Sequence, residues 1–365
     1  MYRGRPFSVK VNSRHERSFQ SFKDFRPREA FHYDPSVKWF PSDMAKARVA
    51  IPKRVPIVDL VVEVRDSRLP ITSAQFELDC SVRLRSGKHR MVVLNKQDLV
   101  HRSVSKESVS LLELRGTPVL ATSAINNSNV SEVLSFISEN VRAKFKSLGV
   151  VVMVTGLPNT GKSTLLNAMR SLCSHPALDK ARAKTSGIPG STNVIGKIQI
   201  SSHNPKIFVL DTPGVMITRS AIEREDDACD IMMKLAAVGA MPDTVPGISL
   251  VADYILFQLN RRRVFNYVDV FALSGPSNDI EQVIDSVARS INNGTDRIDH
   301  HGGTLRFIHM FREGKLGKVC LDDLDSVDSV VEKLQAFPSE PPGPWGPAAY
   351  PVNTSFDRAI YFPRA

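Results

Sequence analysis

The stretch VVMVTGLPNTGKSTLLNAMR, residues 151–170, decides the fold class of this chain of 365 residues. Gly156 to Ser163 match the pattern G-x-x-x-x-G-K-[ST], with the apolar run VVMVT before them and the helix-compatible run STLLNAMR after them. A strand, this loop and a helix in that order are the setting in which the pattern binds phosphate groups. A chance glycine-rich turn would lack both flanking elements. The stretch therefore predicts an α/β fold with a phosphate-binding loop.

The loop supplies residue types that suit a nucleoside triphosphate. Its glycines let backbone N–H groups approach phosphates closely. Lys162 provides a positive charge for the β- and γ-phosphates, and the Ser163 hydroxyl is a suitable ligand for Mg²⁺. The other residues of this stretch that we expect at the nucleotide are Gly156, Asn159, Thr160, Gly161 and Thr164.

A second motif, DTPG at residues 211–214, follows the apolar run KIFVL. Asp211, at the end of that predicted strand, would hold Mg²⁺ directly or through water. Gly214 can offer its N–H to a γ-phosphate. Four residues recur by chance, so the motif gains its weight from its position after the phosphate-binding loop.

A third motif, NKQD at residues 95–98, follows the apolar run RMVVL. The Asp98 carboxylate can accept hydrogen bonds from both N1–H and the N2 amino group of guanine, a donor pair that adenine lacks. The Lys96 stem can lie on the base plane, and Asn95 can tie the loop to its neighbours. Taken alone, NKQD would equally be a surface turn. Together with the other two motifs it predicts that the nucleotide is GTP or GDP.

The base-reading residues precede the phosphate-binding loop, which reverses the order of an ordinary GTP-binding domain. Ser123 and Ala124, at the end of another predicted strand, belong to the same group, because a backbone N–H there can meet guanine O6. Joining the ends of an ordinary domain and cutting the chain elsewhere leaves the order of strands in the sheet unchanged, so the site still assembles. A predicted helix over residues 130–146 would be the joining piece.

Apolar, β-rich runs alternate with polar, helix-compatible stretches as far as Asp211. This alternation predicts parallel strands joined by crossover helices. After residue 230 helical periodicity dominates, and we expect helices that include residues 280–291 and 305–314. The expected strands cover residues 58–66, 90–94, 117–123, 149–155, 196–200 and 206–211.

The composition excludes several classes of protein. Hydrophobic residues make up 42% of the chain, enough to bury a core. No apolar run reaches the roughly 20 residues that a membrane-spanning helix needs. The four cysteines are scattered, which argues against a zinc site or a disulfide framework and for a reducing compartment.

The positive charge is concentrated at the beginning of the chain. The net charge is +10, and residues 1–55 carry 13 Lys and Arg against 5 Asp and Glu, a balance of +8. Such a basic arm suits RNA phosphates, and a solvated or cleaved leader is the alternative. The first fifteen residues are basic and lack an acid, which is typical of a mitochondrial transit segment, although Gly4 and Pro6 disfavour an amphipathic helix there.

Together, these motifs resemble those of the circularly permuted GTPases, and most closely those of the YlqF/RbgA family, which includes the mitochondrial ribosome-associated GTPases. The resemblance covers roughly residues 38–335. It extends to WFPSDMAKAR at residues 39–48, DSRLP at 66–70, PGST at 189–192, KLAAVGAMP at 234–242 and FREGKLGK at 311–318.

The resemblance implies a division of the chain into four parts. A basic arm or targeting segment at residues 1–37 precedes a circularly permuted P-loop GTPase domain at 38–228, with a mostly parallel sheet and helices on both faces. A small all-α, RNA-binding domain follows at 229–337. The tail at 338–365 is rich in proline and is expected to be extended.

The resemblance also implies roles for three residues that the motif chemistry alone does not assign. Asn159 matches a potassium ligand, although a turn-forming asparagine is the alternative. Thr192 matches the Mg²⁺-binding threonine of the first switch and would act in catalysis with Lys162. Asp43 stands where the family has a catalytic histidine, so it either fills that role or abolishes it. Val215 stands where many GTPases carry a water-orienting glutamine, and an apolar side chain cannot orient water.

The implied function is GTP hydrolysis to GDP and phosphate during late maturation of the mitochondrial large ribosomal subunit, in the matrix. The resemblance implies weak intrinsic activity that depends on potassium and is stimulated by the ribosome. The expected partners are ribosomal RNA, large-subunit precursors and other assembly factors; the chain is expected to be a monomer, and peripheral association with the inner membrane stays open. The alternatives are an inactive GTP-binding scaffold, and a nucleolar or bacterial assembly GTPase.

Overall fold

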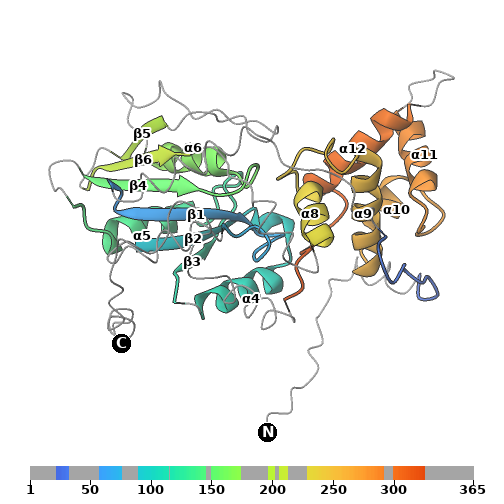
Figure 1. The fold of residues 1–365 in the computed structure, drawn as a ribbon, viewed down its shortest axis with the longest axis horizontal. Coiled ribbons are helices and arrows are strands. Elements are labelled where there is room, and N and C mark those ends of the chain that lie inside the picture. Colours follow the sequence, from blue (N-terminus) through green and yellow to red (C-terminus); the bar gives the residue numbers. More distant parts are fainter. Residues whose placement is uncertain are drawn as a thin grey trace, which may run out of the picture. The chain divides into compact units, whose positions relative to one another are not determined.

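This computed structural model describes residues 22–32, 57–75, 89–114, 116–144, 149–173, 196–201, 205–212, 228–291 and 299–324. The chain forms two compact units, which are described separately here. One combines residues 35–246 with 320–365 and contains the sheet; the other combines residues 1–34 with 247–319 and is helical (Figure 1). The all-α region expected in the C-terminal part of the chain is confirmed.

The described strands form one six-stranded sheet in the order β3-β2-β1-β4-β6-β5 (Figure 1). Neighbouring strands are parallel except β5 and β6, which are antiparallel. The expected mostly parallel sheet is therefore confirmed, and its parallel strands all end at the same edge. The strands are β1 (Leu60–Asp66), β2 (His89–Asn95), β3 (Val119–Ala121), β4 (Val150–Thr155), β5 (Gly196–Ser201) and β6 (Ile207–Asp211).

Strand β1 lies at the centre of the sheet. It pairs with β2, which leads into the base-reading segment, and with β4, which leads into the phosphate-binding loop. Leu60 is in register with His89 of β2 on one side and with Val152 of β4 on the other. The connection from β3 to β4 contains α5 (Val130–Asn140), which is shorter than the predicted helix over 130–146. It ends because Val141 adopts an extended conformation, with φ −109° and ψ 123°.

Helices cover both faces of the sheet, as expected. Apolar side chains of α5 and of α6 (Lys162–Leu172) pack on one face, against alternate residues of β1, β2, β4 and β6. On the opposite face, Leu112 of α4 (Arg102–Glu113) packs with Val92, Leu94 and Val119. Successive side chains of a strand point to opposite faces, so one apolar run packs against the helices on both faces of the sheet.

The α4 face of the sheet also buries a network of charged groups. The Glu63 carboxylate, which is fully buried, accepts hydrogen bonds from Arg65 at 3.0 and 3.1 Å, and also from Arg90. The Gln75 N–H donates to the same carboxylate at 2.7 Å, and the Thr155 hydroxyl donates to the Gln75 side-chain oxygen at 2.7 Å. Thr155 immediately precedes the phosphate-binding loop, so this network fixes the start of that loop.

The helical unit is built from α9 (Ile248–Arg261), α10 (Asn266–Val270), α11 (Ile280–Ile291) and α12 (His300–Arg312). Its largest fully buried side chains are Tyr254, Tyr267 and Phe307. Helix α12 begins five residues before Leu305, the first of the apolar residues that predicted it, and the Asp299 carboxylate caps it by accepting the Gly302 N–H at 2.9 Å. Helix α8 (Ala228–Ala237) belongs instead to the unit that contains the sheet.

Residues 22–32, which fall within the predicted basic arm, pack on this helical unit. Phe22 and Phe25 contact the ring of Phe265 edge-on, with centroid distances of 5.8 and 5.7 Å. Arg28 forms a bidentate ion pair with Asp253 of α9, at 3.0 and 2.6 Å. The charge of Arg28 is thus neutralised within the unit. In the described part of the chain, no helix has the length and hydrophobicity that crossing a bilayer requires.

Candidate functional site

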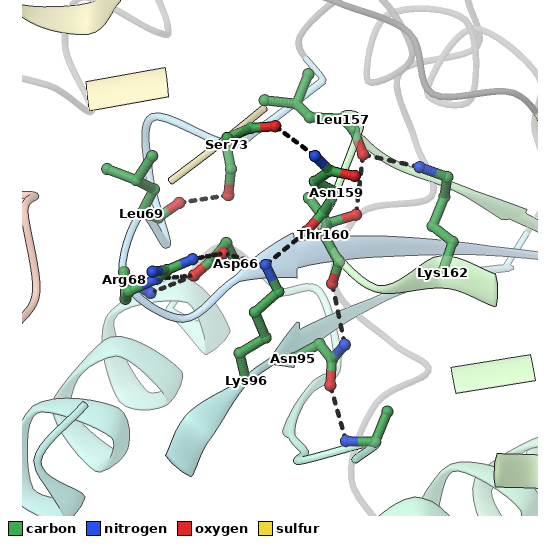
Figure 2. A network of polar contacts seen from close by, with 12 residues as sticks. Asp66, Arg68, Leu69, Ser73, Asn95, Lys96, Leu157, Asn159, Thr160 and Lys162 are labelled. Carbon is green, nitrogen blue, oxygen red and sulfur yellow. Dashed lines mark hydrogen bonds and ion pairs between the residues drawn. The ribbon is translucent and has the colours of Figure 1, made fainter. Parts of the chain in front are cut away.

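The predicted nucleotide-binding loops meet at the edge of the sheet where the parallel strands end. They follow β1 at Asp66, β2 at Asn95, β3 at Ala121, β4 at Thr155 and β6 at Asp211. In open sheets of this kind, ligands bind outside the carboxyl ends of the strands. Figure 2 shows Asp66, Asn95, Lys96 and the loop from Leu157 to Lys162 brought together by polar contacts. The reversed chain order therefore does not prevent the motifs from meeting.

The phosphate-binding loop requires glycine at two positions. Gly156 has φ +152°, and a Cβ there would lie 2.2 Å from the Val64 carbonyl oxygen of β1. Gly161 has φ +91°, and a Cβ there would lie 2.3 Å from the Asn95 side-chain nitrogen. Backbone this close to its neighbours leaves no room for a side chain. Helix α6 starts directly afterwards, at Lys162, so its N-terminal N–H groups and its dipole favour an anion at the loop.

Lys162 is almost completely buried in the loop. Its ammonium group donates to the Leu157 carbonyl at 2.7 Å and to the Gly156 carbonyl at 3.2 Å (Figure 2). Burial lowers the pKa of Lys162 to about 8, with a smaller contribution from the positive charge of Lys96, whereas the negative charge of Asp211 acts in the opposite direction. Polyphosphate beside this ammonium group would favour its charged form.

We therefore expect the protein to take up a proton when it binds GDP above about pH 8. The pKa of Lys162 is about 8, so above that pH the lysine is largely neutral before binding, and phosphate restores its charge. Affinity for GDP should consequently fall as the pH rises through 8 towards about 9. Calorimetry in two buffers with different ionisation enthalpies measures the proton uptake. Uptake that is the same at about pH 7 and about pH 9 would contradict the assignment.

Asp211 has the properties expected of a group that holds Mg²⁺. Its side chain is 5% exposed, and its Oδ1 atom is buried with no hydrogen-bond partner among the described residues. Burial raises the pKa of this carboxyl, and the nearby charge of Lys162 counteracts the rise. A buried carboxylate oxygen without a partner is costly unless a ligand occupies it. Ser163, at the start of α6, is the other described residue that suits the metal.

Asn95 connects three loops of the site. Its side-chain nitrogen donates to the Thr160 carbonyl of the phosphate-binding loop at 2.9 Å. Its side-chain oxygen accepts from the Ala124 N–H at 3.0 Å and from the Thr122 hydroxyl at 3.3 Å. The Thr160 hydroxyl donates to the Leu157 carbonyl within its own loop. Asn95 thus links the base-reading segment to the phosphate-binding loop (Figure 2).

Asp98 lies in the short 3₁₀ helix η2 (Gln97–Leu99). Its Oδ1 atom is buried and has no hydrogen-bond partner within the described residues. A buried carboxylate oxygen that lacks a partner among the described residues is suited to accept a hydrogen bond from a guanine base. This observation supports the base-reading prediction independently of the motif.

The residues after β3 form hydrogen bonds within the protein. The Ser123 N–H donates to the Ser128 carbonyl at 3.0 Å, and the Ala124 N–H donates to Asn95. Both backbone donors therefore have acceptors in the protein, and these hydrogen bonds shape the loop. The hydrogen bond from this segment to guanine O6 stays a prediction. The Ser123 hydroxyl is buried without a partner in the described segments.

Lys96 makes contacts that the motif alone did not indicate. Its backbone is left-handed, with φ 64°, and its ammonium group donates to Asp66 Oδ2 at 2.9 Å and to the Asn159 carbonyl at 2.5 Å. Asp66 is also held by Arg68, through contacts of 3.0 and 2.8 Å. Burial favours the neutral acid, but the charges of Arg68 and Lys96 outweigh burial and hold the pKa of Asp66 well below its usual range.

Asn159 also adopts a left-handed conformation, with φ 57°. Its side-chain nitrogen donates to the Gly239 carbonyl at 2.6 Å. The conformation fits the turn-forming alternative, and the amide contact leaves the potassium assignment a proposal. Thr164 is half-buried on α6. Asp43, Thr192, Gly214 and Val215 lie outside the described residues.

The order of the strands, the glycine-dependent loop and the base-reading segment define a circularly permuted P-loop GTPase. A family model described as 50S ribosome-binding GTPase matches residues 151–289. Mitochondrial ribosome-associated GTPase 1 of Mus musculus is 32% identical over 306 residues, which are 78% of this chain and 90% of the relative. The Xenopus tropicalis protein of the same name is 32% identical over 321 residues, 82% of this chain and 96% of the relative.

The similarity extends to bacterial proteins. Ribosome biogenesis GTPase A of Bacillus cereus is 27% identical over 296 residues, 78% of this chain and 93% of the relative. The crystal structure of GNP-bound YlqF from T. maritima is 23% identical and covers 77% of this chain and 99% of that chain, with a TM-score of 0.49. The chain belongs to the mitochondrial ribosome-associated GTPase 1 family.

Proposed function

We propose that this protein is a mitochondrial GTPase that binds ribosomal RNA of the large-subunit precursor and hydrolyses GTP to GDP and phosphate during late assembly. The observation that carries the proposal is the meeting of Asp98, Lys162 and Asp211 at one edge of the sheet. Asp98 and Asp211 each keep a buried oxygen that has no partner within the described part of the chain. The names of its relatives support the ribosomal and mitochondrial parts of the proposal.

Each described group of the site has a role in this reaction. Asp98 selects guanine, and the backbone N–H groups of the loop and of the first turn of α6 hold the phosphates. Lys162 stabilises the negative charge that develops on the β–γ bridging oxygen and on the γ-phosphate. Mg²⁺, where bound, would neutralise phosphate charge, and Ser163 and Asp211 would hold it. Thr192 and Asp43 are proposed to act at the γ-phosphate, and Asn159 is proposed to hold potassium.

Single-turnover hydrolysis of GTP tests the proposal most directly. The purified protein is measured in potassium and in sodium, alone and with large-subunit precursor particles from mitochondria, from bacteria or from the nucleolus. We expect slow hydrolysis alone, and faster hydrolysis with mitochondrial particles in potassium. If bacterial or nucleolar particles accelerated hydrolysis and mitochondrial particles did not, the mitochondrial assignment would be wrong. Absence of bound guanine nucleotide in every condition would contradict the whole proposal.

A second function is favoured by two residues of the sequence. Asp43 replaces the histidine of the family motif, and Val215 cannot orient water. Both favour a scaffold in which GTP stabilises RNA binding without being hydrolysed. This alternative predicts GTP-dependent binding to the particles and no phosphate release in the same experiment. Exchange of Asp43 for histidine would then be expected to raise the hydrolysis rate.

A further inference from the structure

Two of the chain segments that connect the helical unit with the sheet unit contact the nucleotide-binding loops. The entry segment, residues 238–246, leads into the helical unit at Gly247. The exit segment, residues 320–324, follows that unit after Val319. Both segments belong to the sheet unit by their contacts.

The entry segment is held by the phosphate-binding loop. The Gly239 carbonyl accepts the Asn159 side-chain N–H at 2.6 Å. The Asn159 carbonyl, in turn, accepts the Lys96 ammonium group at 2.5 Å. One residue of the phosphate-binding loop therefore contacts both the base-reading segment and the chain that enters the helical unit.

The exit segment is held by the loop that follows β1. Asp322 is 6% exposed, and its carboxylate accepts the N–H groups of Ile71 and Thr72 at 2.8 and 2.9 Å and the Thr72 hydroxyl at 2.5 Å. The Leu321 N–H donates to the Arg68 carbonyl at 2.8 Å. A buried carboxylate with three donors fixes the loop at residues 68–72, because no water can replace these donors without exposing the group.

The contacts close into a ring. Asp322 reaches the loop at residues 68–72, whose Arg68 pairs with Asp66, and Asp66 holds the ammonium group of Lys96. Lys96 reaches Asn159, and Asn159 reaches Gly239 of the entry segment (Figure 2 shows the part from Arg68 to Asn159). The Lys234 ammonium group lies 3.7 Å from Asp322 Oδ1. Lys234 belongs to α8, which runs directly into the entry segment, so this contact completes the ring.

We propose that Asp322 is a positioning residue for the nucleotide site, acting through Arg68 and Asp66 on Lys96. The loop that carries Asp66 is fixed at its far end by the Asp322 carboxylate, so the place of Lys96 depends on that anchor. A bound nucleotide that favours one position of Lys96 and Asn159 also stabilises the hydrogen bonds that hold the entry and exit segments, because coupling between two sites is reciprocal. The segments that flank the helical unit then respond to the bound nucleotide. The inference rests on the proposed GTP-binding function.

A merely structural anchor would also stabilise the fold, so the variants must separate the two roles. Asp322→Asn keeps the size of the side chain and removes the charge that attracts the three donors. Thr72→Val removes one donor at similar size and serves if the first variant folds poorly. Asp323→Asn is the matched control, because Asp323 is adjacent and exposed.

The affinity for fluorescent GDP and for a nonhydrolysable GTP analogue is measured for each variant, together with the midpoint of thermal unfolding. We expect Asp322→Asn to weaken nucleotide binding by about 5- to 150-fold, the usual range of coupling between sites. Thr72→Val should weaken it less, and Asp323→Asn should leave it unchanged. Unchanged affinity in folded Asp322→Asn protein would overturn the proposal.

Amide hydrogen exchange provides the readout that a structural role alone would not change. In the unaltered protein, saturating GTP analogue should slow exchange at residues 67–73, 238–246 and 320–324. In Asp322→Asn protein, saturated with the same analogue, this slowing should be lost at 320–324 and retained in the phosphate-binding loop. Nucleotide binding without slower exchange in the entry and exit segments would overturn this inference alone. Failure of the unaltered protein to bind guanine nucleotide would overturn the proposed function as well.

Discussion

Exchange of Asp98 for asparagine should weaken GTP and GDP binding by roughly 100-fold, because two charge-assisted hydrogen bonds to the base are lost. The Oδ1 atom of Asp98 is buried without a protein partner among the described residues, so the exchange breaks no hydrogen bond that holds η2. Xanthine carries a carbonyl where guanine carries an amino group, and the asparagine amide can donate to it. The same variant should therefore bind xanthosine nucleotides more tightly than guanosine nucleotides.

Competition of both nucleotide classes against fluorescent GDP and fluorescent xanthosine diphosphate measures this exchange of preference. Gln97→Ala is a suitable control, because Gln97 is the adjacent residue and donates to Ser128 rather than to a base. It should change affinity for both classes equally. If Asp98→Asn protein kept the affinity of the original chain for GTP, the assignment of NKQD as the base-reading segment would be wrong.

The second large effect concerns stability: Glu63→Ala should lower the free energy of unfolding by about 3–5 kcal/mol, the usual cost of breaking a buried ion pair. The exchange leaves Arg65 buried beside a cavity and removes the acceptor for the Gln75 N–H. Chemical denaturation measures the loss. Glu107→Ala, at an exposed position of α4, is the matched control and should change stability by less than about 0.5 kcal/mol.

The Glu63 carboxylate also makes the stability of the protein depend on pH in the acid range. Burial alone would raise the pKa of Glu63, but Arg65 and Arg90 outweigh burial and lower it from 4.5 to about 2. The folded state therefore binds fewer protons than the unfolded state between these two values. The contribution of Glu63 to stability is complete above about pH 4.5 and is lost as the pH falls towards 2. Glu63→Ala protein should lose less stability over this interval than the original chain, and an equal loss in both would contradict the pairing.

Most of the sheet could be predicted from the sequence, because buried parallel strands appear as short apolar runs between turn and helix signals. The predicted strands over 58–66, 90–94 and 206–211 each correspond to a strand of the structure. The helix predicted over 130–146 was too long, because apolar spacing does not show that Val141 turns into extended backbone. The early start of α12 was missed because the cap of Asp299 lies before the apolar pattern begins.

The contacts within the site were less predictable than its motifs. Motif chemistry names the groups that face a nucleotide, and Asn95 was expected to tie the loops together. Motif chemistry does not show which other residues fix the position of these groups. Asp66 and Arg68 were noticed only as part of a resemblance, and the contact of Asp66 with Lys96 depends on the parallel pairing of β1 with β2. Asp322 could not be connected with Thr72, because the two residues are separated by 250 positions.

The packing of residues 22–32 on α9 has a consequence for the way the chain is made. Arg28 and Asp253 are separated by 225 residues, so the partners of this segment emerge from the ribosome long after the segment itself. At ordinary rates of synthesis the interval is roughly 10–45 s. During this time Phe31 lacks its ring contacts with Tyr254 and Phe257 of α9, and Phe22 and Phe25 lack Phe265. Closing so long a loop is slow compared with forming local helices. The helical unit is therefore completed only when residues 22–32, made early, pack on helices that are made much later.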